Sequence, residues 1–435
     1  MENKEKTGSV CPEKTLIVNY RGLQIGGIET FLAKLIKYST EKSYRVIWMT
    51  TPKNVEKCDF KDIVNHPLVE KVFIKGKSHR WLPHKRIRFQ DGECVTMITM
   101  EPLNYMKAEK IRAYAKNVKR FDHFLALPHF TGIAYYPERT FKSKLLREHF
   151  GKYMKKNIET WLKEDCIRAY SMKHLDFYEK NYGITIENKE EKILQKINLI
   201  KDFDEEFFKN KASERKNNFT IVTCARFDFP HKGYMLGLLD DYKELKEKYS
   251  QLKLVIIGYG SGEKRIKEKL EAMTEAQRQD VELVGAVSPF DLSKHFEKGH
   301  LNVGLAGALF DGAICALPSV CVRHYSEECQ TYGHISDMTG TYLRSDEGEA
   351  IKPYIERLIN MSDEEYISIT KRDFERARLL KTNNPQYIFD QRTKTGKCTI
   401  TGFNAIRARL FNLMEEATRV LRKTRACEED ITEKK

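Results

Sequence analysis

Two cations flank a short turn within the stretch "IVTCARFDFPHKGYM". Arg226 ends an apolar, strand-like run, and Lys232 follows a Pro-containing turn and precedes a helical pattern that opens at Gly233. An Arg offers planar bidentate donors and a Lys a compact charge, and both suit phosphate oxygens. At the carboxyl end of a strand, the N–H groups of the following helix would favour the same ligand. The pattern therefore predicts an anion site, and the alternative is a solvated loop in a basic protein.

Two glycine-rich stretches are further candidates for binding a ligand. Gly26 and Gly27 follow a first apolar run, where bare backbone could approach a ligand closely or serve only a tight turn. The stretch "GYGSG" at 258–262 reads G-x-G-x-G and departs from the dinucleotide fingerprint G-x-G-x-x-G. This departure disfavours an NAD-dependent oxidoreductase.

The elements that must position these residues read as alternating strands and helices, which predicts an α/β class with parallel sheets covered on both faces. The first half begins with the strands "TLIVNY" and "YRVIWMT", and a charged crossing at 186–218 precedes a second cycle with "FTIVTC", "KLVIIG", "VELVG", "LNVGLA" and "PSVCV". Helices are expected to begin near 233, 263, 289 and 311 in this second cycle. We predict two doubly wound, Rossmann-like domains at 1–200 and 201–385, followed by a helical segment at 386–435 that packs back on the first domain. A cleft is expected between the carboxyl ends of the strands of the two domains.

Charge and cysteine usage narrow the class of partner and compartment. The 435 residues carry a formal charge of +14, which favours polyanionic partners such as nucleic acid, an anionic membrane surface or phosphorylated substrates. No apolar run reaches the ~18 residues of a membrane span, and the first residues lack the apolar core of a signal peptide. The ten cysteines form no C-x-x-C pair, so we expect a cytoplasmic protein with buried thiols and no structural metal. Binding to nucleic acid rests on charge alone, because the aromatic-studded basic strands of common RNA modules are missing.

The stretch "CARFDFPHKG" resembles the phosphate-binding turn of the GT-B glycosyltransferases, in particular their large, mostly retaining nucleotide-sugar family (group 1, or family 4-like). Four more stretches are similar to that family and follow in its order: "GGIETFLAKLIKYSTEKSYRVIWMT", "KLVIIGYGSGEKRIKEKL", "VELVGAVSPFDLSKHF" and "ICALPSVCV". The resemblance covers most of the chain. It implies two Rossmann-like domains that face each other across a cleft, the first binding an acceptor and the second a nucleotide-sugar donor.

The resemblance also implies roles for single residues. Arg226 and Lys232 would stabilise the charge that grows on the leaving diphosphate without a metal or other cofactor. The donor would be contacted by backbone of Gly26, Gly27, Gly258, Gly260 and Ala286. His129 follows the strand-like "DHFLALP" and would lie near the donor sugar as a catalytic residue, with a purely structural histidine as the alternative. The donor phosphate itself could accept the proton of the acceptor.

One motif departs from the family pattern of two Glu residues separated by seven others. Asp311 takes the second position, before "GAICALP", and the first falls on the apolar Val303. Asp311 is expected to hold ribose hydroxyls, or else to be a helix N-cap. The loop "GLAGAL" would offer backbone N–H groups at Ala308 and Leu309. The departure leaves the sugar and the stereochemical outcome open, and a catalytically inactive homologue that binds a glycan or a protein partner is the main alternative.

Two further patterns concern metal and membrane. Asp202 and Asp204 match the D-x-D metal signature of the other major glycosyltransferase fold, but their place in the charged crossing favours solvated charge. The basic segments 75–88 and 139–156 suggest an anionic inner membrane leaflet, where lipid-linked acceptors reside. In 139–156 the alternative is core packing by its apolar side with a solvated basic face. We thus expect transfer of a sugar to a growing glycan or lipid-linked acceptor in surface polysaccharide synthesis.

Overall fold

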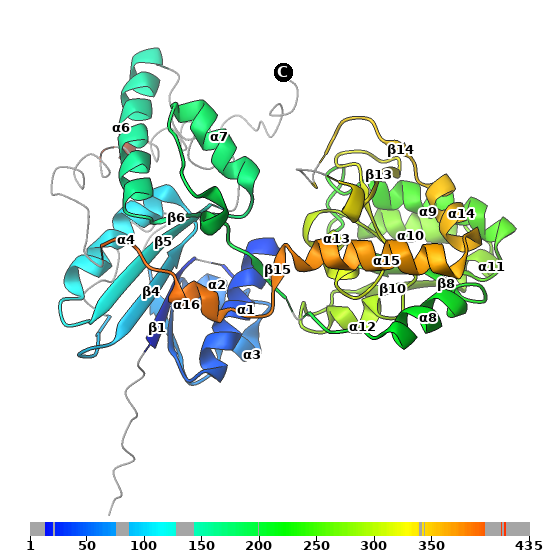
Figure 1. Ribbon diagram of the computed structural model, residues 1–435, viewed down its shortest axis with the longest axis horizontal. Helices are drawn as coiled ribbons and strands as arrows, with labels where there is room; N and C mark the ends of the chain where they lie inside the picture. The colour runs from blue at the N-terminus through cyan, green and yellow to red at the C-terminus, as the bar shows by residue number, and fades with distance from the viewer. Residues whose placement is uncertain are drawn as a thin grey trace, which may run out of the picture. The chain divides into compact units, whose positions relative to one another are not determined.

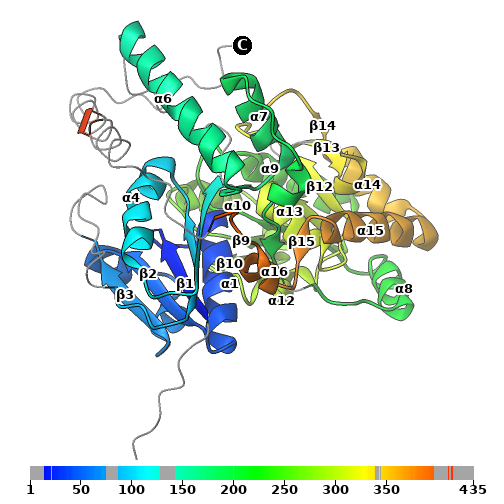
Figure 2. The same ribbon diagram turned by 60° about the vertical axis from the view of Figure 1, so that its left-hand side comes forward.

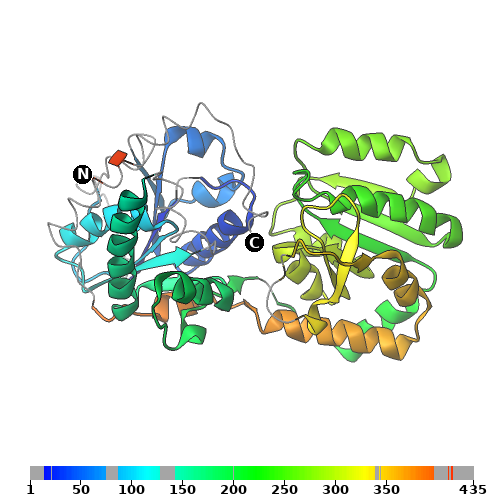
Figure 3. The ribbon, with the colours of Figure 1, turned by 90° about the horizontal axis from the view of Figure 1, so that it is seen from above.

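The computed structural model describes residues 14–20, 22–74, 87–127, 143–198, 200–338, 342, 344–395, 410 and 413–414 (Figure 1). The chain divides into two compact units: residues 1–195 with 384–435 form unit 1, and residues 196–383 form unit 2. Each unit is an open sheet with helices on both faces, as Figures 2 and 3 show.

Unit 1 has a six-stranded, wholly parallel sheet in the order β3-β2-β1-β4-β5-β6. The strands are β1 Lys14–Asn19, β2 Arg45–Thr50, β3 Val69–Phe73, β4 Cys94–Thr99, β5 Arg120–Leu127 and β6 Ile167–Ala169. The helices are α1 Gly27–Glu41, α2 Pro52–Glu56, α3 Lys61–Val64, α4 Pro102–Tyr114, α6 Lys144–Lys163, α7 Met172–Tyr182 and α16 Gln386–Asp390, with the 3₁₀ turn η2 Lys189–Lys192. The central strands are near-continuous apolar runs because both of their faces are buried.

Unit 2 has a seven-stranded sheet in the order β10-β9-β8-β11-β12-β13-β14. The strands are β8 Phe219–Cys224, β9 Leu252–Ile257, β10 Val281–Gly285, β11 Leu301–Gly304, β12 Ser319–Val322, β13 Gln330–His334 and β14 Glu349–Ala350. The helices are α8 Glu205–Glu214, α9 Tyr234–Lys248, α10 Glu263–Glu271, α11 Glu275–Arg278, α12 Leu292–Phe296, α13 Ala306–Ala313, α14 Lys352–Asn360 and α15 Asp363–Arg378, with the 3₁₀ turn η3 Ile335–Asp337. The short strands β7 Lys196–Ile197 and β15 Lys381–Thr382 pair in parallel.

Both sheets have a topological switch point, where the chain leaves the central strand toward one edge and later returns to build the other. In unit 1 this point lies between β1 and β4, and in unit 2 between β8 and β11. Open parallel sheets bind ligands outside the carboxyl ends of the strands at such a point. Each unit therefore has a defined edge at which a site is expected.

The predicted α/β class and the doubly wound architecture are confirmed in both units. Two details differ from the prediction. The edge strands β13 and β14 are antiparallel, and their polar sequences gave no apolar run to detect. The helix expected near 311 begins at Ala306, because the chain turns sharply after β11 with Ala306 in the left-handed region at φ 47°. Asp311 consequently lies in the second turn of α13, and the alternative that it is an N-cap was wrong.

Candidate functional site

The turn after β8 is held by backbone hydrogen bonds on both sides. The N–H of Lys232 donates to the carbonyl of Asp228 at 2.7 Å, and the N–H of Gly233 donates to that of Pro230 at 3.0 Å. From the neighbouring loop, the carbonyl of Tyr259 accepts from Phe227 N–H at 2.8 Å. The turn is thus a fixed structure at the carboxyl end of β8, beside the switch point of unit 2.

Arg226 and Lys232 act on each other electrostatically across this turn. Lys232 is half-buried, and burial first and the charge of Arg226 second lower its pKa to about 8. Among the described residues, neither side chain has a carboxylate partner within ion-pair distance, although the charge of Asp228 partly offsets the effect on Lys232. Two cations held near each other without a paired carboxylate are suited to an external anion.

A nearby arginine shows that carboxylates do pair with cations in this region. Arg265 on α10 makes a bidentate ion pair with Glu327, with N···O distances of 2.7 and 2.8 Å. Its guanidinium lies over the ring of Phe229, in the same turn as Arg226. Arg226 and Lys232 thus have no carboxylate partner, among the described residues of unit 2, in a region where a neighbouring arginine does have one.

Gly233 is explained by packing against the segment that follows β12. A Cβ at Gly233 would lie 2.6 Å from the carbonyl oxygen of Ser326, and one at Gly237 would lie 2.5 Å from the backbone N of Cys329. These two glycines are one helical turn apart on α9, so a face without side chains lets residues 326–329 approach the helix. The Lys-Gly pair thus combines a site residue with a packing residue.

The glycines of "GYGSG" are likewise in close contact with the Arg226 turn. A Cβ at Gly258 would lie 1.9 Å from the carbonyl oxygen of Ala225, and one at Gly260 would lie 2.8 Å from that of Phe227. The N–H of Gly258 also donates to the carbonyl of Gly285 at 2.9 Å. The predicted donor contact at Gly258 therefore cannot use its N–H, which is already bonded to Gly285. Gly260 is exposed.

The first turns of α13 are held by hydrogen bonds from Asn302, a residue that the sequence did not lead us to predict. Its Nδ2 donates to the carbonyls of Ala308 and Leu309 at 3.2 and 3.0 Å, and to Ser319 Oγ at 3.1 Å. Gly312 is required there, because a Cβ would lie 2.3 Å from the Asn302 amide. An Asn in the otherwise apolar run "LNVGLA" was the available signal.

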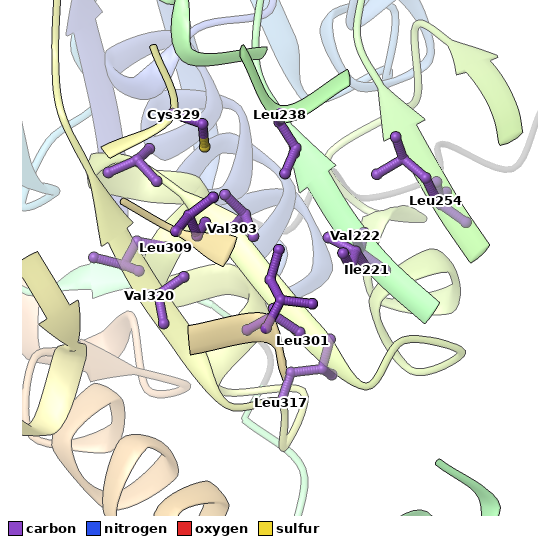
Figure 4. Packing of buried hydrophobic residues seen from close by; sticks show 14 of the residues in the cluster. Ile221, Val222, Leu238, Leu254, Leu301, Val303, Leu309, Leu317, Val320 and Cys329 are labelled. Atoms are coloured by element: carbon purple, nitrogen blue, oxygen red, sulfur yellow. The ribbon is translucent and has the colours of Figure 1, made fainter. Parts of the chain in front are cut away.

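Three predicted positions of this region lie in or beside the core. Val303 and Leu309 are fully buried among the residues shown in Figure 4, so the first position of the expected acidic pair is occupied by a core side chain. The N–H of Leu309 donates to the carbonyl of Leu305 at 3.5 Å, and a ligand that accepts from this N–H would have to compete with that bond. Ala308 is half-buried, with its N–H in the first turn of α13.

Asp311 is held by two residues distant in sequence. Its Oδ1 accepts from Lys381 Nζ at 2.9 Å and from Asn198 Nδ2 at 2.8 Å. Lys196 and Lys381 both lie over the ring of Phe310, and burial lowers the pKa of Lys196 to about 8. The charge of Asp311 also contributes to the raised pKa of the Cys224 thiol, so the carboxylate lies near the end of β8. Asp311 is thus at the predicted edge, but already paired.

Two histidines adjoin Lys232. The rings of His231 and His324 meet edge to face at 4.3 Å between centroids, and Tyr325 packs on both. Burial first, and then the charges of His231 and Lys232, lower the pKa of His324 to about 4. His324 is therefore neutral at neutral pH and adds no charge to the site.

The remaining predicted donor contacts lie in different places. Gly26 ends the loop before α1, where a Cβ would lie 2.4 Å from Glu29 Oε2, and Gly27 is exposed with no atom near its missing Cβ. Ala286 is exposed directly after β10. The predicted catalytic His129 lies outside the described residues.

The basic and acidic segments are placed as follows. In 139–156 the described residues Phe150, Tyr153 and Met154 are in the core of unit 1, while Leu145 is exposed. Residues 75–86 of the other basic segment lie outside the described part. Asp204 is the N-cap of α8 and accepts from Phe207 N–H at 2.8 Å.

Within the described part of the chain, no helix has the length and apolar character of a membrane span.

Comparison with known proteins supports the fold. No family model and no curated protein matches the sequence. Among solved structures, a glycosyltransferase from Rickettsia africae matches with a TM-score of 0.50 and 12% identity, over 93% of this chain and 98% of that one. The N-terminal domain of a Candida albicans trehalose-6-phosphate phosphatase scores 0.47 at 12% identity, over 87% and 96%. The chain has the fold of the GT-B glycosyltransferases, as its sequence predicted.

Proposed function

We propose that this GT-B chain is a glycosyltransferase that transfers a sugar from a nucleotide-sugar donor, with the diphosphate of the donor bound at Arg226 and Lys232. The observation that carries the proposal is this pair of cations, which have no carboxylate partner in the described part of the chain. They lie at the carboxyl end of β8, beside the switch point of unit 2. Such positions bind ligands in open parallel sheets.

Transfer of a sugar from a nucleotide-sugar requires fixed positive charge next to the departing diphosphate. When the glycosidic bond of the donor breaks, negative charge accumulates on the departing diphosphate. Preorganised cations stabilise that charge without having to reorganise during the reaction. The N–H groups at the start of α13 would assist through the helix dipole. Arg226 would bind two oxygens in one plane, and Lys232 would provide a point charge.

The finer features of the proposal follow from the sequence. We expect the acceptor to be a glycan or a lipid-linked sugar, with retention of configuration and no metal requirement. Ribose binding by Asp311 would have to accommodate its bonds to Lys381 and Asn198. The basic face of α6 would then serve attachment to an anionic membrane surface.

A catalytically inactive binding protein is the second candidate. It is favoured by the apolar Val303 at the first position of the expected acidic pair and by the pairing of Asp311. Such a protein could still bind a glycan or a partner through the same fold.

The test is a panel of UDP-, GDP- and CMP-sugars, scored by donor hydrolysis or transfer and by calorimetric binding. Arg226→Ala and Lys232→Ala should each reduce turnover by about 10²-fold or more, the usual loss when one donor to a developing anion is removed. The control is Arg278→Ala on α11, which removes an exposed cation and should leave turnover unchanged.

Full activity in both site variants would show that the diphosphate is bound elsewhere. Binding of a nucleotide-sugar without turnover under any condition would favour the inactive homologue. Failure of every nucleotide and nucleotide-sugar to bind would contradict the proposal.

A further inference from the structure

A line of buried polar side chains crosses unit 1 and ends at the carboxyl edge of its sheet. Glu109 on α4 lies 2.5 Å from His123 Nδ1 on β5, and His123 Nε2 lies 2.8 Å from Thr99 Oγ1. Asn19 Nδ2 donates to the same Thr99 oxygen at 3.0 Å. All four residues are at most 2% exposed. The proposed reaction uses none of them.

The direction of each hydrogen bond in this line follows from the charges. Arg112 pairs with Glu109 at 3.3 Å, and burial lowers the pKa of His123, so the imidazole is neutral. A neutral ring that donates Nδ1–H to Glu109 has an unprotonated Nε2, which accepts the Thr99 hydroxyl. The Thr99 oxygen can then only accept from Asn19. The amide of Asn19 is therefore oriented, with Oδ1 directed away from Thr99.

Asn19 Oδ1 has no hydrogen-bond partner among the described residues, although the atom is buried. A buried acceptor without a donor costs about 1–3 kcal/mol. Asn19 ends β1 and Thr99 ends β4, and these two strands flank the switch point of unit 1. The open acceptor thus lies at the place where an open parallel sheet binds its ligand.

We propose that Asn19 accepts a hydrogen bond from a hydroxyl group of a neutral sugar at the switch point of unit 1, and that Thr99, His123 and Glu109 are positioning residues for it. An amide oxygen repels an anion, and a cation at this buried, uncharged acceptor would lose more hydration than it regains. A hydroxyl supplies the missing donor without burying charge. The identification of the ligand as a sugar rests on the proposed function. The unsatisfied Asn19 Oδ1 is observed independently of that function.

The experiment measures the binding of two kinds of probe to the full chain, methyl glycosides and pyrophosphate. Methyl glycosides of glucose, galactose, mannose and N-acetylglucosamine are screened by saturation-transfer NMR, and pyrophosphate is titrated by calorimetry. Asn19→Ala and Thr99→Val should each weaken the best glycoside by about tenfold, the equivalent of one hydrogen bond. Thr99→Ser keeps the hydroxyl and should restore binding, and all three variants should bind pyrophosphate as the unaltered chain does.

The outcomes separate this inference from the proposed function. A glycoside whose affinity is unchanged in Asn19→Ala would overturn it, as would the absence of any glycoside binding in a chain that still binds pyrophosphate. Equal loss in Thr99→Ser and Thr99→Val would show that the residue matters for packing and would remove the positioning role. Loss of pyrophosphate binding in Arg226→Ala, with glycoside binding intact, would support separate sites. Absence of pyrophosphate binding in the unaltered chain would contradict the proposed diphosphate site and leave the glycoside result to stand by itself.

Discussion

At the scale of single residues, the turn after β8 contains a lysine whose charge depends on pH in the working range. Burial and the neighbouring Arg226 lower the pKa of Lys232 to about 8. Below this value the amine is protonated and attracts an anion, and above it the amine is neutral. A bound diphosphate would raise the pKa again, so binding and proton uptake are linked.

We therefore expect pyrophosphate affinity to fall as the pH rises through about 8, at up to about tenfold per pH unit for one linked proton. Titrations from about pH 7 to about pH 9 by calorimetry would measure this slope. Lys232→Arg is the matched control, because arginine keeps its charge throughout this range. The ratio of the two affinities removes the titration of the ligand itself, and a ratio that does not change with pH would contradict the assignment.

At the scale of elements, glycines decide how closely α9 and the segment 326–329 pack. A Cβ at Gly237 would lie 2.5 Å from the backbone N of Cys329 and 2.6 Å from the carbonyl oxygen of Glu327. Both atoms belong to the backbone and cannot move independently of the segment. This packing supports the helix that begins at the Lys232 turn.

Gly237→Ala should therefore destabilise the protein, because overpacking costs about 1–3 kcal/mol and exceeds the ~1 kcal/mol that Ala gains over Gly in a helix. Gly151→Ala on α6 is the control with the opposite sign: no atom lies within 4 Å of its missing Cβ, and it should stabilise by ~1 kcal/mol. Thermal unfolding followed by circular dichroism measures both. A higher melting temperature for Gly237→Ala would show that the segment 326–329 yields easily.

At the scale of the whole molecule, the chain returns to unit 1 after completing unit 2. Phe389 on α16 is buried against Tyr38 and Tyr44, with ring centroids 6.2 and 5.1 Å apart. Asp122 on β5 accepts from the N–H of Thr393 at 2.8 Å. Residues more than 300 positions downstream thus complete the core that α1 and β2 begin.

Phe389→Ala should destabilise unit 1 by about 3–5 kcal/mol, the usual cost of truncating a buried Phe. Hydrogen exchange read by mass spectrometry would test this, with loss of protection in β1 and β2. Peptides from β8 and β9 in unit 2 serve as the internal control and should keep their protection. Equal loss in both units would mean that the segment stabilises the chain as a whole.

The sequence by itself determined the doubly wound class, because strands buried on both faces must be continuous apolar runs and need no knowledge of their partners. It also determined that Arg226 and Lys232 lie on either side of one turn, because this turn is local in sequence. The helix expected near 311 begins instead at Ala306, more than one turn earlier, because small residues such as those of "GLAGAL" carry little helical periodicity.

Only the tertiary structure decided which polar groups are already satisfied. Asp311 is paired with a lysine 70 residues away, and Asn19 is linked to Thr99 across 80 residues. The glycines of "GYGSG" are required by their close contact with the turn after β8, whether or not a ligand also binds there. Such facts depend on which distant segments the fold brings together, and no local pattern contains them. The physical reason is that a hydrogen bond or a close approach is a property of two segments, whereas hydrophobic periodicity is a property of one.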